Sequence, residues 1–276
     1  MSLPDLLLRV LFWGAIYLGA ARIGAWITRS DLRGISHLAW DGLAGFPVII
    51  AAWLTVGLVR FDRFSVLAVT VAVLVFAAIR IVKDPLRRFA RPAARCPSRT
   101  LALAILFVVA GLGLIWNQVP VLFFDSLAYH HAQPELWLFE SRITPYEWSL
   151  HSWFPPGMSV LYGVGLALGG EPWGNDANLL LFVSLGLATF DLGRRLWNPR
   201  AGTFALAALL SLPQILYALM IPAADLAHGT FVFGSIAALT LSRSEGGGSW
   251  ERHAAWIAGG ALLTKYLGLL VPLAAG

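Results

Sequence analysis

The residues best suited to chemistry gather in one polar stretch, positions 123–157, between apolar runs. A carboxylate or an imidazole in such a stretch can accept a proton from a hydroxyl group. An otherwise apolar chain has little reason to keep these groups unless they act at a membrane surface. The stretch holds three of the six histidines, four acids and a single basic residue, namely His130, His131, His151, Asp125, Glu135, Glu140, Glu147 and Arg142.

Asp125 is the strongest candidate for a catalytic base. It directly follows the apolar run VPVLFF, so we expect its carboxylate at the membrane–water boundary, where a lipid phosphate also sits. Transfer of a sugar from a lipid phosphate needs a base for the acceptor hydroxyl and a cation or a metal for the departing phosphate. The plain structural alternative is a helix N-cap, a position at which Asp is common. Asp125 could fill both roles.

The residues after Asp125 have helical spacing. Positions 126–141 place apolar residues on one stripe, which predicts a helix lying on the membrane and divided near Pro134. The stripe consists of Tyr129, Ala132, Leu136 and Phe139. We also expect three tryptophans of the loop to form an interfacial aromatic belt, namely Trp137, Trp148 and Trp153.

Two pairs in this segment are four residues apart and can share a helix face: Asp125 with Tyr129, and His131 with Glu135. Asp125, His131 and Glu135 are the candidate ligands if the protein uses a divalent metal as its cofactor. Their spacing matches no compact zinc motif. We expect Tyr129, His130 and His131 to contact the substrate, and the alternative for the two histidines is packing at the interface.

Four later residues complete the candidate site. Lys265 is one of two lysines and falls inside the apolar run GALLTKYLGLL. An unpaired ammonium there costs about 2.5–3.5 kcal/mol on insertion scales, so we expect it to meet a phosphate or an acid such as Asp225. Tyr266 follows it directly. Asp225 and His228 are either further substrate-binding groups or caps at the end of a span.

Composition indicates an integral membrane protein. Residues of the hydrophobic class make up 58% of the chain and charged residues 13%, about half the charged share of soluble domains. The formal charge of +5 is not a sign of nucleic-acid binding, because the excess arginines lie largely between apolar runs, where they set orientation. The single cysteine, Cys96, excludes a disulfide framework within the chain.

The apolar runs predict an all-α bundle of eight or nine transmembrane helices, because a span needs roughly 20 apolar residues. The ninth run, 157–168, is short enough to be a half-span. The last residues continue an apolar run, so we expect the chain to be a fragment of a longer protein. The eight longer runs are Leu6–Ile27, Gly42–Val59, Phe64–Val82, Thr100–Trp116, Ala177–Phe190, Ala201–Met220, Ala223–Leu241 and Ala254–Ala275.

The basic loop from Arg80 to Arg99 predicts the orientation. It holds six arginines and one lysine against one acid, so it should be cytoplasmic and the loop 117–156 external. Arg194 and Arg195 should also face the cytoplasm, which requires that the run 157–168 does not cross fully; the alternative is that this second basic cluster is an exception to the rule. That interpretation puts Asp225 on the same side as Asp125. It divides the chain into a three-span region, 1–99, and a core, 100–276.

The order of several segments resembles the GT-C superfamily of polytopic glycosyltransferases, in particular the branch with aminoarabinose transferases and protein O-mannosyltransferases. The resemblance covers roughly Leu101–Gly276, and no single motif is specific. The three N-terminal spans have no counterpart, and the C-terminal part common in the family is absent. The segments are FFDSLAYHHAQPELWLFESRI, FPPGMSVLYGVGLALGG, a span ending in GRRLW, PAADLAHGTF and GALLTKYLGLL.

The resemblance implies a polyprenyl-phosphate sugar donor and a loop acid that matches Asp125. It also implies that the Pro-rich segment before the next span matches Phe154–Pro156, and that later polar positions match Asp225 and Lys265–Tyr266. Many members carry two adjacent loop acids, whereas Ser126 follows Asp125 here. We therefore expect a membrane enzyme, in composition suited to a bacterial inner membrane, that moves a sugar to a lipid, glycan or protein. The alternatives are a transporter or flippase for a lipid or small solute, and a non-catalytic scaffold.

Overall fold

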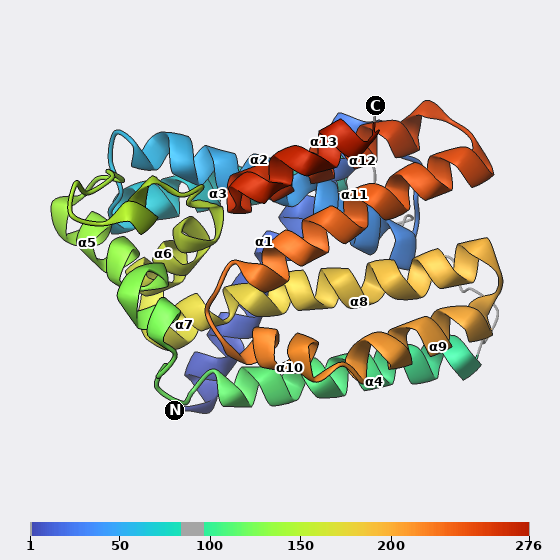
Figure 1. The fold of residues 1–276 in the computed structure, drawn as a ribbon, viewed down its shortest axis with the longest axis horizontal. Coiled ribbons are helices and arrows are strands. Elements are labelled where there is room, and N and C mark those ends of the chain that lie inside the picture. The colour runs from blue at the N-terminus through green and yellow to red at the C-terminus, as the bar shows by residue number, and fades with distance from the viewer. Residues whose placement is uncertain (1, 84–96, 276) are drawn as a thin grey trace.

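The computed structural model describes residues 2–83 and 97–275 of the chain. Most of the basic loop that precedes Arg99, including Cys96, lies outside these residues. Within the described part all regular secondary structure is helical, with no strand. Figure 1 shows long helices lying side by side, with short helices gathered at one end. The fold class predicted from the apolar runs is therefore confirmed at the level of an all-helical protein.

Four long helices precede the polar loop, and a short π-helix, η1, leads into the second. The first helix begins at the N-cap Ser2, whose side chain accepts a hydrogen bond from the backbone N–H of Asp5, the usual role of serine at this position. It ends at Arg29, which takes the left-handed conformation. The elements are α1 Leu3–Thr28, η1 His37–Asp41, α2 Gly42–Gly57, α3 Arg63–Lys83 and α4 Pro97–Trp116.

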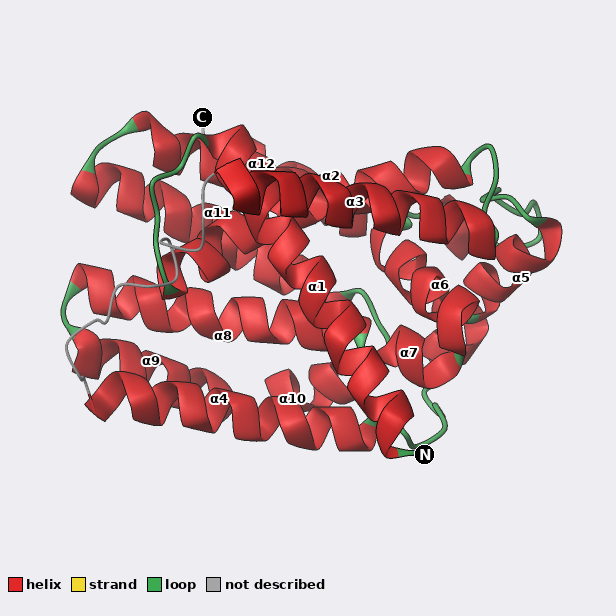
Figure 2. Cartoon of the chain, turned by 180° about the vertical axis from the view of Figure 1, so that it is seen from behind, coloured by secondary structure: helices red, strands yellow, loops and turns green. Residues whose placement is uncertain are grey.

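The polar loop contains short helices, and longer helices resume after it. Figure 2 shows α4 running beside α9 and α10, below α8. The short elements are η3 Ser126–His130, α5 Ala132–Glu140, η4 Leu150–Trp153, α6 Gly157–Gly169 and α7 Glu171–Asn175. The later elements are α8 Ala177–Leu196, α9 Pro199–Leu210, α10 Pro213–Met220, α11 Asp225–Glu245, α12 Gly248–Thr264, η5 Tyr266–Leu269 and α13 Leu270–Ala275.

Five helices of the described residues are long and apolar enough to cross a membrane, or six if one bent pair counts as a span. This supports an integral membrane protein but not the predicted eight or nine spans. The five are Leu3–Thr28, His37–Gly57, Arg63–Lys83, Pro97–Trp116 and Glu171–Leu196.

The remaining predicted spans are interrupted, short or too polar. The run Ala201–Met220 is broken into α9 and α10, which bend by 66°. Pro213 explains the break, since proline disfavours helix at the preceding residue. The run Ala254–Ala275 is not one helix, because α12 ends at Thr264. Helix α11 is long, but it is not among the helices apolar enough to cross, and α6 has only 13 residues.

The two ends of the bundle differ in chemistry. Short α6 and α7 return the chain to the start of α8 at the end where the polar loop lies, and α8 then runs to the opposite end (Figure 1). Arg195 lies at that opposite end, where it pairs with Asp191 and Glu245. We call the first the loop end, defined by residues 117–156, and the second the arginine end, defined by Arg194 and Arg195. Asp225, at the start of α11, belongs to the loop end, as expected.

The N-terminal helices share the core with the rest of the chain. A buried ion pair joins Arg9 Nε of α1 to Asp176 Oδ2 at 2.6 Å, and Trp40 Nε1 donates to Asp191 Oδ2 of α8 at 2.9 Å. The arginine inside the first apolar run is thus neutralised by an acid 167 positions away, as a charge buried among membrane helices must be.

Helices α1 and α2 cross with their backbones in contact. A Cβ atom added at Gly45 would lie 1.9 Å from the carbonyl oxygen of Ala20, and one added at Gly24 would lie 1.8 Å from that of Asp41. Only glycine allows so close an approach, which is the mode of packing that small residues give to membrane helices.

We expect Gly45→Ala to destabilise the fold by about 2 kcal/mol or more, because a backbone oxygen cannot move aside as a side chain can. Thermal unfolding in detergent measures the effect. The matched control is Gly259→Ala in α12, where nothing lies within 4 Å of the added Cβ; it should leave stability unchanged or raise it by about 0.5–1 kcal/mol. Equal effects of the two substitutions would contradict the close crossing.

Candidate functional site

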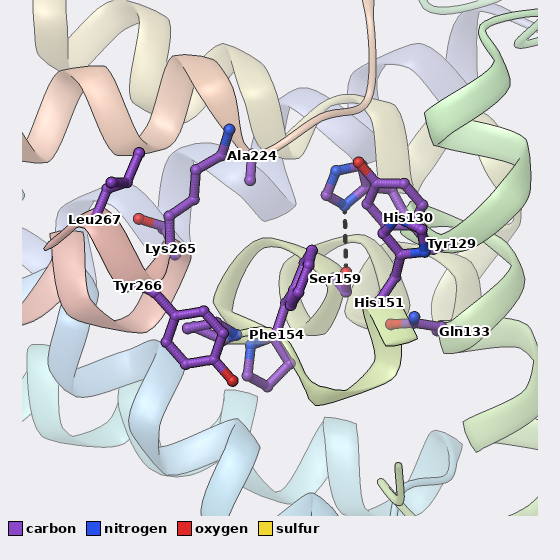
Figure 3. A pocket seen from close by; sticks show the side chains of 13 residues that line it. Tyr129, His130, Gln133, His151, Phe154, Ser159, Ala224, Lys265, Tyr266 and Leu267 are labelled. Atoms are coloured by element: carbon purple, nitrogen blue, oxygen red, sulfur yellow. Dashed lines mark hydrogen bonds between the residues drawn. The ribbon is translucent and has the colours of Figure 1, made fainter. Parts of the chain in front are cut away.

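A cavity of about 320 Å³ opens at the loop end, between the short loop helices and the ends of the long ones. Figure 3 shows Lys265, Tyr266 and Leu267 on one side of it, and Tyr129, His130 and Gln133 on the other. The floor comes from the first turn of α6. The lining residues are Tyr129, His130, Gln133, His151, Phe154, Pro155, Pro156, Ser159, Ala224, Thr264, Lys265, Tyr266 and Leu267.

Close packing fixes the position of the cavity walls. Ser126 Oγ of η3 donates to the carbonyl oxygen of Pro222 at 2.6 Å, and the hydroxyl of Tyr162 in α6 donates to that of Ala223 at 2.8 Å. A Cβ atom at Gly157 would lie 2.5 Å from the carbonyl oxygen of Leu263, so α6 begins directly against α12. The loop helices are therefore tied to the start of α11 and the end of α12.

Lys265 supplies the one charged side chain among the lining residues. It is not mid-span, as the apolar run suggested, because α12 stops at Thr264 and Lys265 has extended backbone angles. Its Nζ lies 2.6 Å from Asp225 Oδ1, and the two side chains are 36% and 70% exposed. The predicted pairing with Asp225 is thus confirmed, in a setting where a soluble group can reach the ammonium.

Asp125 is connected to the cavity through Tyr129. It stands before the π-helix η3, yet its side chain makes no capping hydrogen bond, so the N-cap alternative finds no support. Burial, together with the nearby carboxylates of Asp125 and Asp225, raises the pKa of the Tyr129 hydroxyl to about 12. Tyr129 therefore stays protonated and faces two acids. Asp125 itself is half-buried and is not among the lining residues.

His130 forms part of the cavity wall as a neutral ring. Its Nδ1 lies 3.4 Å from the hydroxyl of Ser159 in α6. Burial lowers the pKa of the His130 imidazole to about 3, although Asp225 acts in the opposite direction. At neutral pH the ring can therefore donate and accept hydrogen bonds, but it does not carry a charge.

His131 is not among the residues that line the cavity. Burial lowers the pKa of its ring, and its polar neighbours are Glu171 and Asn175, not Glu135. Glu135 is exposed. Accordingly, Asp125, His131 and Glu135 do not assemble into a cation site, and no cluster of three potential metal ligands occurs in residues 2–83 and 97–275.

The boundary between the loop helices differs from the expected one. The chain breaks at His131, between η3 and α5, whereas Pro134 lies inside the first turn of α5, where proline is tolerated. Trp137 does not join an interfacial belt: it is 1% exposed, packs edge-on against Phe61 and donates to the carbonyl oxygen of Thr144. The tryptophans at 148 and 153 are exposed, as expected.

Two further predicted residues, His228 and Tyr266, lie near Lys265. His228 Nδ1 lies 3.2 Å from Thr264 Oγ1, which places the ring behind the cavity rather than in its lining. Tyr266 does line the cavity, and its hydroxyl donates to the carbonyl oxygen of Trp153. This bond fastens the segment after α12 to the end of the polar loop.

Sequence reasoning missed several lining residues. Gln133 and Ser159, which the sequence did not single out, belong to the wall together with Phe154. The ring of His151, one of the histidines of the polar stretch, stacks on Tyr129 at 4.4 Å between centroids. His151 also contacts Phe154, which contacts Tyr266 in turn, so a row of aromatic rings crosses the cavity. Only the position of Gln133 three residues after His130 hinted at a shared face.

The cavity combines a single ammonium with neutral donors and acceptors. An ammonium can hold an anionic group such as a phosphate, and hydroxyl, amide and imidazole groups can hold a polar, uncharged one. The two acids near Tyr129 supply proton acceptors at the edge. Chemically, this arrangement is suited to a ligand with one anionic part and one neutral polar part.

The neutral state of His130 makes stability depend on pH. In the unfolded chain the ring binds a proton below about pH 6.5, whereas in the folded protein it binds one only near pH 3. Between these two values the unfolded state is protonated and the folded state is not. The free energy of unfolding therefore falls as the pH drops through this window. Between pH 7 and 4.5 the loss from this ring is up to about 2–3 kcal/mol. We expect His130→Gln to lose less stability than the wild type over that range in thermal unfolding. An equal loss in both proteins would contradict the neutral ring.

Comparisons with known proteins give no match: no protein-family model, no curated protein and no solved structure resembles the chain closely enough to be significant.

Proposed function

We propose that the protein is a membrane glycosyltransferase that moves a sugar from a polyprenyl-phosphate donor to an acceptor hydroxyl. The observation that carries the proposal is the loop-end cavity, in which the ammonium of Lys265 faces a neutral hydrogen-bonding wall. This arrangement matches a phosphosugar, whose phosphate is anionic and whose sugar is polar. The order of segments that resembles GT-C enzymes supports the same conclusion.

The donor phosphate binds Lys265 in this proposal. The Lys265–Asp225 pair is largely exposed, and exposed ion pairs contribute only about 0–1 kcal/mol. A phosphate can therefore compete with Asp225 for the ammonium. The lipid tail then extends into the bilayer beside the apolar helices, which face outward with many exposed leucines, valines and phenylalanines.

Asp125 acts as the base. The acceptor oxygen forms a bond to the anomeric carbon of the sugar while the bond from that carbon to the phosphate oxygen breaks. The acceptor proton passes to the Asp125 carboxylate, and the electron pair of the broken bond stays on the lipid phosphate, beside Lys265. Tyr129 remains protonated and orients Asp125, because burial and the two acids hold its pKa near 12.

The proposal extends to the membrane topology. The arginine end faces the cytoplasm and the loop end the outside of a bacterial inner membrane, because arginines between spans favour the cytoplasmic side. The acceptor is a lipid, glycan or protein that approaches from outside. A divalent metal at this site would draw part of its ligands from the phosphate, since no cluster of three potential metal ligands occurs in residues 2–83 and 97–275.

A transporter or flippase is the second candidate, favoured by one observation. The α9–α10 pair bends by 66°, and broken helices build the substrate sites of many transporters. That break does not line the loop-end cavity, so the transporter ranks second. Uptake of a lipid or solute into proteoliposomes without any sugar transfer would favour it.

Asp125→Asn should abolish sugar transfer, with a loss of about 100-fold or more, because the amide cannot accept the proton. Transfer from radiolabelled polyprenyl-phosphate sugars, with and without a chelator, measures the effect. The matched control is Glu147→Gln, an exposed acid of the same loop outside the cavity, which should keep its activity. Full activity of Asp125→Asn, with the folded protein intact, would remove its catalytic role.

Lys265→Met and Asp225→Asn should separate the two partners of the ion pair. Loss of the ammonium should raise the KM for the donor about tenfold or more, since a charge-assisted contact to phosphate is lost. Asp225→Asn frees the ammonium and should leave the KM unchanged or lower it. Equal increases in both variants would indicate that the pair serves the fold and not the phosphate.

A further inference from the structure

We infer that the cavity selects an uncharged monosaccharide, held against a neutral wall formed by Gln133, His130 and Ser159, over an amino sugar or a uronic acid. This rests on the proposed function, because it specifies the sugar of the same donor. The three residues come from α5, η3 and α6 and face the cavity opposite Lys265 (Figure 3).

The side-chain amide of Gln133 has a buried hydrogen-bond donor without a partner. The side chain is 4% exposed, and its Nε2 atom has no hydrogen-bond partner although it is buried. Buried polar groups in folded proteins are nearly always paired, and an unpaired one costs free energy. A sugar hydroxyl that enters the cavity can accept from this amide, and the amide oxygen can accept from a second hydroxyl.

The other two groups of the wall are also uncharged. The His130 ring is neutral because of its burial, and its Nδ1 is already within reach of the Ser159 hydroxyl. A hydroxyl can donate one hydrogen bond and accept another at the same time. Ser159 can therefore contact His130 and a ligand together. Such a wall matches the hydroxyl groups of a neutral sugar, which also donate and accept.

The charges around the wall disfavour both kinds of charged sugar. An amino sugar would bring an ammonium toward Lys265 and would find no carboxylate in the cavity lining, because Asp125 and Asp225 lie outside that lining. A uronic acid would bring a third carboxylate near those two acids. Like charges at such separations repel, and more strongly in a partly buried site than in water.

The size of the cavity favours a single sugar unit. At about 320 Å³ it lies at the lower end of the range for small-molecule sites, roughly 300–1,000 Å³. The aromatic row from Tyr129 to Tyr266, which crosses it, takes up part of the space between its two sides.

The test compares equilibrium binding of three donors that share the same polyprenyl phosphate and carry glucose, 4-amino-4-deoxyarabinose or glucuronic acid. The wild type should bind the glucose donor at least tenfold more tightly than the other two. Transfer from each donor is recorded separately, so that selectivity and catalysis are judged independently. Selective binding without transfer upholds the inference and removes the proposed enzyme activity.

Variants of Gln133 sharpen the test. Gln133→Leu should weaken binding of the glucose donor about tenfold, and Gln133→Glu should reverse the preference toward the amino sugar by adding a carboxylate to the wall. The matched control is Gln118→Glu, the same change at the end of α4, outside the cavity, which should keep the wild-type ratio. Thermal unfolding checks that each variant is folded.

The remaining outcomes overturn the inference. Equal or tighter binding of the amino sugar or the uronic acid by the wild type contradicts the neutral wall, whether or not transfer occurs. No binding of any donor overturns both the inference and the proposed function. A preference for glucose that Gln133→Glu leaves unchanged would show that another part of the cavity selects the sugar, which also refutes the role of this wall.

Discussion

The candidate site depends on the point at which helix α12 stops. Thr264 ends the helix, and Lys265 is extended, with φ −152° and ψ 151°. The chain therefore leaves the helix axis beside the first turn of α11, and the Lys265 ammonium reaches Asp225 at 2.6 Å. A continuous span would have buried this charge in lipid at considerable cost. The break instead brings it to the loop end, where a hydrophilic ligand can approach.

The rest of the loop end holds this break against the polar loop. Ser126 bonds to the backbone of Pro222, Tyr162 bonds to that of Ala223, and Gly157 lies against Leu263. These contacts join η3 and α6 to the two helix ends that carry Asp225 and Lys265. Groups held by packing and hydrogen bonds lose little freedom when a ligand binds, so the cavity is largely formed before any substrate arrives.

The sequence predicted the parts of the fold that follow from local composition. Five of the eight or nine predicted spans coincide with helices long and apolar enough to cross a membrane, because long apolar runs can only be helices in lipid. The run around Lys265 required a partner, which is Asp225. The breaks were not predicted, because Pro213 and Lys265 each stand inside a run that stays largely apolar on both sides. Trp137 resembles Trp148 in sequence, yet only Trp137 meets Phe61 and becomes buried. Gln133 and Ser159 were missed for the same reason: contacts between distant segments, not local pattern, place them in the wall.

The most direct test of the account is an experimental structure of the protein in lipid nanodiscs with a polyprenyl-phosphate glucose bound. The account predicts density for the phosphate at the Nζ of Lys265 and for the sugar against Gln133 and Ser159, with the anomeric carbon on the side of Asp125. Density for the donor away from the loop-end cavity, or a cavity that stays empty at saturating donor, would contradict it.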